Sequence, residues 1–162
     1  MREAGGGPPS DRAARMVEVG SKDVTARRAV AECTITMTPE ACAALVSGTP
    51  KGNPLEAAKV AGLMAAKRTP DLLPFCHPIA LTGASVVLEP DVDHGIIRVE
   101  ATVKANDRTG VEMESLTAAA VAALSLYDTA KAYDRSAVIS GLRLVQKSGG
   151  KSGEYRAETS PT

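Results

Sequence analysis

The chain has 162 residues, 44% of them hydrophobic and 23% charged, and its 19 basic and 19 acidic residues give no formal net charge. This length fits one domain with an ordinary core, and the charge balance gives no indication of a basic surface of the kind that grips long nucleic acid. The only aromatic residues are Phe75, Tyr127, Tyr133 and Tyr155, too few for a surface that stacks bases.

Three cysteines, Cys33, Cys42 and Cys76, fit neither a disulfide framework nor a paired-cysteine zinc motif, and they indicate a reducing cytoplasm. No stretch approaches the roughly 20 apolar residues of a membrane helix, and the start lacks the pattern of an export signal. We therefore expect a soluble cytoplasmic protein with no membrane or nucleic-acid partner.

Residues 1–15 are rich in glycine and proline and have little to bury, so they predict a disordered leader. Residues 16–156 are expected to form a single domain, and residues 157–162 a flexible tail. No internal repeat is present in the sequence.

A strand is predicted from Ala31 to Met37, where apolar and polar residues alternate. Thr38 can cap a short helix that has proline in its first turn, and Gly48 can end it in a left-handed conformation. A second helix should follow Asn53 and run to Lys67, with Gly62 permitting close packing.

The segment 70–78, "PDLLPFCHP", holds three prolines and is predicted to be a stiff, non-helical loop that can position polar side chains. Runs at 84–89 and 96–104 flank the turn cluster "PDVDHG" and predict an antiparallel hairpin. One face of its second strand should carry Ile97, Val99, Ala101 and Val103.

An Ala-rich helix is predicted from about 111 to 133. Its expected apolar stripe is Leu116, Ala120, Ala123, Leu124 and Tyr127. A last strand should run from 138 to 145, followed by the flexible basic segment "KSGGKSGEYRAE". These elements predict an α+β fold, a ferredoxin-like sandwich with a mainly antiparallel sheet and helices packed on one face.

Lysines beside glycine or in turns form the first candidate site: Lys51 in "TPKGN", and Lys147 and Lys151 in "KSGGKSG". Glycine lets backbone N–H groups approach an anion and an ammonium adds charge, which suits phosphate or pyrophosphate. Any one of these lysines taken alone is more simply explained as a solvated loop residue.

Cys76 and His77 lie between two prolines. His77 could act as a general acid, a phosphate contact or a metal ligand, or it could be a hydrogen-bonded structural residue. A zinc site would need His94, the other histidine, which lies in a predicted turn.

Two pairs of charged residues belong to the long helix. Glu112 and Glu114 are two apart and do not form an acid/base pair by themselves; either could instead stabilise the helix start. Asp128 and Lys131 share one helical face, as a surface ion pair or, in a sheltered pocket, as partners in proton transfer.

Helix length limits how these groups can combine. The fourteen steps from Glu114 to Asp128 span about 21 Å at roughly 1.5 Å per residue, more than the width of a small-molecule pocket. If both residues function in one site, a neighbouring subunit must supply one of them, which favours an oligomer.

From Met16 to Arg156 the chain resembles the bacterial cyclic pyranopterin monophosphate synthases of the molybdenum cofactor biosynthesis protein C family. The resemblance rests on "MVEVGSK", "KGNPLEAAKVAGLMAAKRTPDLLPFCHPI", "TGVEMESLTAAAVAALSLYD" and "KSGGKSG". It implies a ferredoxin-like homohexamer, a trimer of dimers with shared active sites. It also implies a lyase that converts cyclised dihydro-GTP, (8S)-3',8-cyclo-7,8-dihydroguanosine 5'-triphosphate, to cyclic pyranopterin monophosphate and pyrophosphate.

The resemblance assigns roles residue by residue. Lys51, Asp128 and Lys131 match catalytic groups, with Asp128 as principal acid/base. The substrate-contacting stretches are matched by Phe75, Cys76, His77, Met113 and Glu114, and further pocket positions by Arg27, Glu112, Lys147 and Lys151. No resident cofactor or metal is implied, although Mg²⁺ can accompany the triphosphate.

The chemistry needs these residue types. Ring rearrangement requires proton transfers, for which Asp128 and Lys131 are suited, and Lys51, Arg27 and His77 could stabilise the charge of pyrophosphate. The chain departs from the family at Asn53, which stands in place of the usual aspartate, and in "YDTAK", which replaces Tyr-Asp-Met-Cys-Lys. Two rival readings are a non-catalytic nucleotide-phosphate binding module and a structural metalloprotein.

Overall fold

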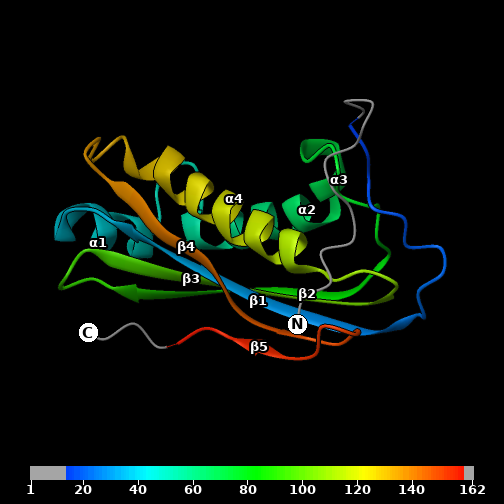
Figure 1. Ribbon diagram of the computed structural model, residues 1–162. Coiled ribbons are helices and arrows are strands. Elements are labelled where there is room, and N and C mark those ends of the chain that lie inside the picture. Colours follow the sequence, from blue (N-terminus) through cyan, green and yellow to red (C-terminus); the bar gives the residue numbers. More distant parts are fainter. Residues whose placement is uncertain (1–13, 159–162) are drawn as a thin grey trace.

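The computed structural model describes residues 14–158, within which five strands form one antiparallel sheet in the order β2-β3-β1-β4-β5. Its helices cover one face of that sheet, so the predicted α+β, ferredoxin-like sandwich is confirmed (Figure 1). In chain order the elements are β1 (Thr25–Thr36), α1 (Pro39–Ser47), α2 (Pro54–Lys67), α3 (Thr69–Leu72), β2 (Leu81–Asp91), β3 (Ile96–Asp107), α4 (Glu112–Ala130), β4 (Val138–Ser148) and β5 (Tyr155–Arg156). Most of the predicted leader, residues 1–13, and residues 159–162 of the tail lie outside the described residues.

The central strand, β1, pairs with β3 on one side and with β4 on the other. The second half of the strand, from Ala31 on, where apolar and polar residues alternate, was predicted correctly. Cys33 and Ile35 in this half are buried against the helices. The strand begins at Thr25, earlier than predicted, because its first half interrupts the alternation with Arg27 and Arg28 yet still pairs with β3. The predicted hairpin is also confirmed as β2 and β3, with both strands longer than expected.

The predicted helix starts are confirmed. The Thr38 hydroxyl accepts from Ala41 N at the start of α1, and Asn53 Oδ1 accepts from two backbone N–H groups at the start of α2. Gly48 has the expected positive φ of 89°, but its ψ of 161° does not close a left-handed turn. The chain extends there because it leads directly into the bridge between Thr49 and Gly52.

The proline-rich segment was predicted to be wholly non-helical, and that prediction is wrong at its start. Thr69–Leu72 form the short helix α3, with Pro70 in the first turn. Proline is tolerated there because the first N–H groups of a helix have no intrahelical partner. Residues 73–80 are irregular, as expected.

The buried face of α4 matches the predicted stripe only in part: Ala123 is buried, and Leu116 and Tyr127 pack against the core. Leu124 is 56% exposed, whereas the buried positions include Ser115, Ala118, Ala119, Ala122, Ala123 and Leu126. Because alanine occurs on every face, hydrophobicity alone did not fix the phase of the helix. Small residues face the sheet and α2 because they allow close approach, and the larger Leu124 is left outside.

Gly62 is where α2 meets α4. A Cβ added there would lie 2.9 Å from the Ala118 carbonyl oxygen and 2.9 Å from Val86 Cγ2. We expect Gly62→Ala to lower the free energy of unfolding by about 1 kcal/mol, since overpacking of roughly 1–3 kcal/mol exceeds the gain of about 1 kcal/mol in helix propensity.

Chemical denaturation tests this expectation, with Ala57→Ser at an exposed position of the same helix as control. A Gly62→Ala variant more stable than the wild type would contradict this expectation, because it would show that α2 and α4 can move apart without loss of packing free energy.

The chain end contains a strand that was not predicted. Residues Tyr155 and Arg156 form β5 against β4, inside the segment expected to be flexible. A two-residue strand lacks a periodic signal of its own, so the sequence pattern could not reveal it. Among residues 14–158, no helix has the length and apolar character needed to cross a membrane.

Candidate functional site

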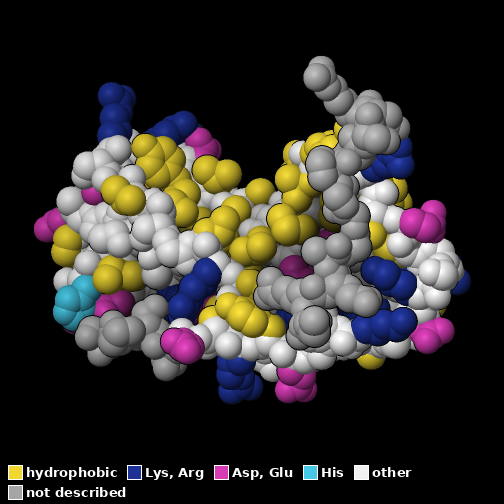
Figure 2. Space-filling model, viewed as in Figure 1, with side chains coloured by type: hydrophobic (Ala, Val, Ile, Leu, Met, Phe, Trp, Pro, Cys, Tyr) yellow, Lys and Arg dark blue, Asp and Glu magenta, His cyan; other side chains and the backbone are white. Residues whose placement is uncertain are grey.

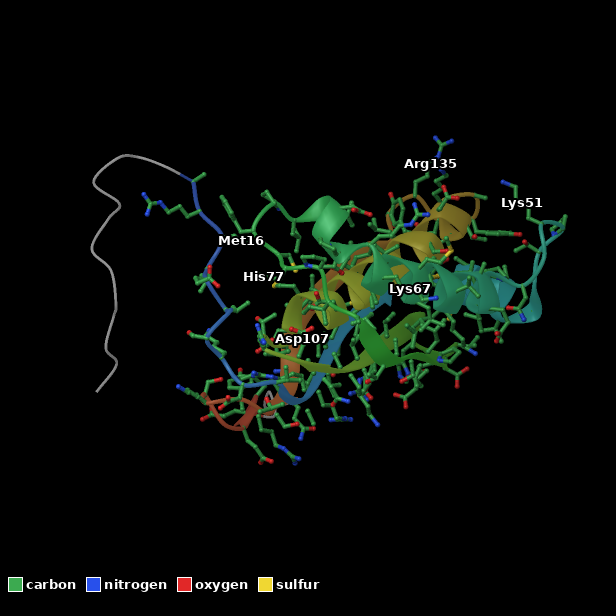
Figure 3. All side chains as sticks on the ribbon, turned by 90° about the vertical axis from the view of Figure 1, so that its right-hand side faces the viewer. Met16, Lys51, Lys67, His77, Asp107 and Arg135 are labelled. Carbon is green, nitrogen blue, oxygen red and sulfur yellow. The ribbon has the colours of Figure 1, made fainter. Side chains whose placement is uncertain are left out.

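The predicted site residues lie in two clusters at opposite ends of α4. The C-terminal cluster comprises Lys51, Asp128 and Lys131. The N-terminal cluster comprises Arg27, Phe75, Cys76, His77, Glu112, Met113, Glu114, Lys147 and Lys151. Figure 3 shows Lys51 and His77 far apart. Helix α4 is unbroken from Glu112 to Ala130, so the expected separation of about 21 Å between Glu114 and Asp128 holds.

The centre of the C-terminal cluster is an ion pair. Asp128 Oδ1 lies 2.7 Å from Lys131 Nζ, on one helical face as their spacing predicted. The hydrogen bond from Lys131 lowers the pKa of Asp128, and the charges of Lys131 and, more weakly, Lys51 act in the same direction. Asp128 is therefore held ionised, the state required of a general base, beside an ammonium that can act as an acid.

A cavity of about 340 Å³ surrounds this pair. It is lined by Thr49, Pro50, Lys51, Asp128, Thr129, Lys131, Ala132, Tyr133 and Arg135. Tyr133 and Arg135 were missed because no motif marks them; the only available signal was their place within one turn of Lys131. Figure 3 shows Lys51 and Arg135 at the same end of the molecule.

Asp134 fixes the loop that follows Lys131. Its Oδ2 accepts from Thr38 N at 2.9 Å, and its Oδ1 accepts from Ser136 N at 2.8 Å and from the Ser136 hydroxyl at 2.6 Å. The end of α4 is thereby tied to the start of α1. The Asp128–Lys131 pair thus has a rigid support, although the pair itself is exposed.

The N-terminal cluster contains a buried carboxyl group. Glu114 is 2% exposed; its Oε1 accepts from Cys76 Sγ at 3.4 Å, and its Oε2 has no hydrogen-bond partner within residues 14–158. Burial raises the pKa of Glu114, which favours a neutral acid able to donate a proton or a hydrogen bond. Burial also raises the pKa of the Cys76 thiol to about 11, so it is a poor nucleophile at neutral pH.

Replacing Glu114 by glutamine is expected to raise the melting temperature more at about pH 8 than at about pH 4. With a raised pKa the folded state holds the proton more tightly than the unfolded chain. The free energy of unfolding therefore falls as pH rises from below the pKa of Glu114 in the unfolded chain through its higher pKa in the folded state. Glutamine does not titrate, so the variant does not lose this stability. Thermal melts at the two pH values measure the effect, since each 1 kcal/mol of unfolding free energy shifts the melting temperature by about 2–4 °C.

The exposed Glu154→Gln serves as the control for those melts. An identical change in melting temperature at both pH values would show that Glu114 carries no such penalty.

His77 and two apolar side chains complete this end. His77 Nε2 lies 2.7 Å from the Val17 carbonyl oxygen, which can only accept, so Nε2 carries the proton. Phe75 and Met113 are exposed beside this buried acid and offer an apolar surface to a ring system. Such a site can orient a heterocycle and protonate it.

The metalloprotein reading is not supported by the geometry. His94 lies in the β2–β3 turn, bonded to Asp91 at 2.8 Å, next to the start of α1 and remote from Cys76. Within the described part of the chain, no three His, Cys, Asp or Glu side chains come together in a way that could hold a metal ion.

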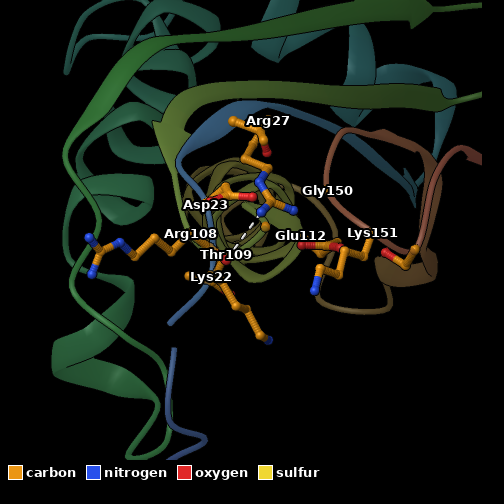
Figure 4. Close-up of a pocket in the computed structure, with 11 residues that line it drawn as sticks. Lys22, Asp23, Arg27, Arg108, Thr109, Glu112, Gly150 and Lys151 are labelled. Atoms are coloured by element: carbon orange, nitrogen blue, oxygen red, sulfur yellow. Dashed lines mark hydrogen bonds between the residues drawn. The ribbon is translucent and has the colours of Figure 1, made fainter. Parts of the chain in front are cut away.

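Three of the remaining N-terminal residues, Arg27, Glu112 and Lys151, line a second cavity of about 610 Å³, and Lys147 lies outside its lining (Figure 4). Glu112 does not share the burial of Glu114; its Oε1 lies 3.8 Å from Lys147 Nζ. The lining residues are Lys22, Asp23, Thr25, Arg27, Arg108, Thr109, Gly110, Glu112, Gly150, Lys151 and Ser152. Lys22 was not singled out although it ends the motif "MVEVGSK", and Arg108 lies in a separate loop just before "TGVEMES".

The departures from the family pattern are structurally mild. Asn53 Oδ1 accepts from Leu55 N at 3.0 Å and from Glu56 N at 3.2 Å, as an aspartate could. Ala130 in "YDTAK" is fully buried and packs in the core.

Comparisons with known proteins show the family to which the chain belongs. A model described as the MoaC family matches residues 16–150. A cyclic pyranopterin monophosphate synthase of Parvibaculum lavamentivorans is 54% identical over 147 residues, 90% of this chain and 92% of that protein. Proteins of the same name from Pelotomaculum thermopropionicum and Roseiflexus sp. are each 52% identical over 88% of this chain, covering 84% and 90% of their own lengths. The range matched by the family model contains every residue of both clusters except Lys151.

Proposed function

The chain belongs to the MoaC family, and from that premise we propose that it acts as a cyclic pyranopterin monophosphate synthase, a lyase of molybdenum cofactor biosynthesis. Its substrate is cyclised dihydro-GTP, and its products are cyclic pyranopterin monophosphate and pyrophosphate. The observation that carries this proposal is the ionised Asp128 hydrogen-bonded to Lys131 in a cavity beside Lys51.

The two ends of α4 have different roles: the C-terminal cluster transfers protons, and the N-terminal cluster binds the heterocycle. Asp128 takes protons from the rearranging ring system and Lys131 returns them, while Lys51 stabilises developing negative charge. At the other end, Glu114 and His77 hold the heterocycle through hydrogen bonds, and Phe75 and Met113 contact its apolar faces. Cys76 stays a thiol and orients the Glu114 carboxyl group.

We assign the complete site to two copies of the chain. Because about 21 Å separates Glu114 from Asp128, one substrate cannot touch both residues of a single chain. Between the clusters, Val60, Met64 and Leu124 expose apolar side chains on α2 and α4, where the surface is hollowed (Figure 2). A two-fold partner packed there with its α4 antiparallel would bring the N-terminal cluster of one copy to the C-terminal cluster of the other.

A trimer of such dimers is the assembly that the family resemblance implies, and we propose it here. The protein needs no resident cofactor in this account, and Mg²⁺ enters with the triphosphate. A cytoplasmic location fits the free thiols of Cys33, Cys42 and Cys76.

The direct test is turnover of enzymatically generated cyclised dihydro-GTP, following pyrophosphate and the cyclic pterin product together. Equal amounts of both are expected from the wild-type protein. Tight substrate binding with neither product would favour the rival function, a non-catalytic nucleotide-phosphate binding module.

A further inference from the structure

We propose that Asp134 is a positioning residue for turnover: by bonding the start of α1 to the end of α4, it holds Lys51 in place opposite the ion pair of α4. Asp134 is not among the residues that line the C-terminal cavity, so it acts through other residues. Its contacts come from the structure, and the reaction that they serve rests on the proposed function.

The C-terminal cavity has two walls that come from distant parts of the chain. The first wall is the turn after α1, with Thr49, Pro50 and Lys51, and the second is the end of α4 and the loop after it, from Asp128 to Arg135. Figure 1 shows α1 at the end of the molecule where α4 finishes. The charge of Lys51 reaches Asp128 from the first wall, since it contributes to the lowered pKa of that carboxyl group. How well the catalytic groups act together therefore depends on how the two walls are placed.

The first wall is fixed to α1. Thr49 and Gly52 exchange two backbone hydrogen bonds of 2.9 Å, and Lys51 N donates to Thr49 Oγ1 at 3.3 Å. This tight turn gives the Lys51 backbone little freedom relative to the helix before it. Helix α1 has nine residues and is about 14 Å long, so a change in its tilt would move Lys51.

The second wall continues from α4 through backbone hydrogen bonds. Lys131 N donates to the Tyr127 carbonyl at 2.9 Å. The N–H groups of Tyr133 and Asp134 both donate to the Ala130 carbonyl, each at 2.8 Å. Asp134 therefore has a fixed position three residues beyond Lys131, and a contact made by its side chain acts on the whole end of α4.

Asp134 joins the two walls by bonding an N–H group that α1 does not satisfy itself. Thr38 is the N-cap of α1, and its own N–H lies outside the helix. In a capping box, a Glu or Gln side chain at the third helical position bonds this group, but that position here is Ala41. Asp134 Oδ2 accepts from Thr38 N instead, at 2.9 Å and from 96 residues away in the sequence. One charge-assisted hydrogen bond thereby fixes the start of α1 to the end of α4.

The two carboxylate oxygens of Asp134 contact different donors. Oδ1 accepts from the N–H and the hydroxyl of Ser136, whereas Oδ2 accepts from Thr38 N. The Ser136 hydroxyl and, after it, the two N–H groups lower the pKa of Asp134, so both oxygens are acceptors at neutral pH. Asparagine has a single acceptor oxygen, and its amide N–H groups cannot accept from Thr38 once that oxygen faces the two donors of Ser136. Asp134→Asn therefore breaks the bond to α1 and leaves the bonds within the loop.

The kcat and KM of the full chain for cyclised dihydro-GTP test this role. We expect Asp134→Asn to lower kcat about tenfold and to keep KM within about twofold, because the heterocycle binds at the other cluster and only the reacting groups are displaced. Ser136→Ala is the matched control: it removes one bond within the loop, keeps the bond to α1 and should leave kcat within about twofold. Both variants are assayed well below their melting temperatures, so that a loss of kcat reports on folded protein. A lower melting temperature with wild-type kcat in Asp134→Asn would show a structural role only and overturn the proposal.

A double-mutant cycle tests whether the effect passes through Lys51. In a Lys51→Ala background the first wall has no ammonium to position, so adding Asp134→Asn should lower kcat by less than about twofold. A tenfold loss in both backgrounds would overturn the proposed link to Lys51. Unchanged kcat of Asp134→Asn beside an active wild type refutes the positioning role alone, whereas a wild type without turnover refutes the synthase function and this role together.

Discussion

Asp128→Asn should lower the rate of product formation by roughly 100-fold or more, the usual contribution of a positioned general base. The side chain keeps its shape but loses the charge that accepts a proton and its ion pair with Lys131. Its side chain is 73% exposed, so the free energy of unfolding should hardly change. Steady-state assays of both products, together with thermal melts, measure the two effects.

Asp93→Asn is a matched control, because Asp93 is an exposed aspartate in the β2–β3 turn, away from both clusters. Lys131→Ala should also lose turnover while keeping its stability, since it removes the other half of the pair. If the Asp128→Asn protein were as active as the wild type, another residue would have to be the general base, and the role proposed for the C-terminal cluster would be wrong.

Local patterns predicted most of the fold. Strict alternation placed the second half of β1, and caps at Thr38 and Asn53 placed two helix starts. The predicted stripe of α4 was right at Ala123 but wrong at Leu124, because the alanines of this helix carry little directional hydrophobicity. Strand β5 was missed because it depends on its pairing with β4. In both cases tertiary contacts, which no local pattern contains, decided the outcome.

The sequence predicted which site residues lie together only where those residues belong to the same helix or its end. The three-residue spacing of Asp128 and Lys131 sufficed to pair them. Spacing also separated Glu112 from Glu114, but it could not tell which one the fold would bury. Lys22 and Arg108 lie in loops 86 residues apart in the sequence, so only the folded chain places them in one cavity.

The central claim is that the two ends of α4 work together across two copies of the chain. A mixture of two inactive variants tests it most directly. Asp128→Asn damages the C-terminal cluster and Glu114→Gln the N-terminal cluster, so each variant alone has no intact site. In a mixed dimer, one site combines both defects and the other has none.

Unfolding and refolding the two variants together in equal amounts should make half of the dimers mixed, each with one of its two sites intact. The mixture is therefore expected to recover about a quarter of wild-type turnover. Refolding Asp128→Asn alone should recover about 1% of wild-type turnover or less. Refolding Glu114→Gln alone should likewise recover far less than a quarter, and the two single refoldings control for the treatment. Recovery near a quarter supports the shared site, and a mixture as inactive as its components would contradict it.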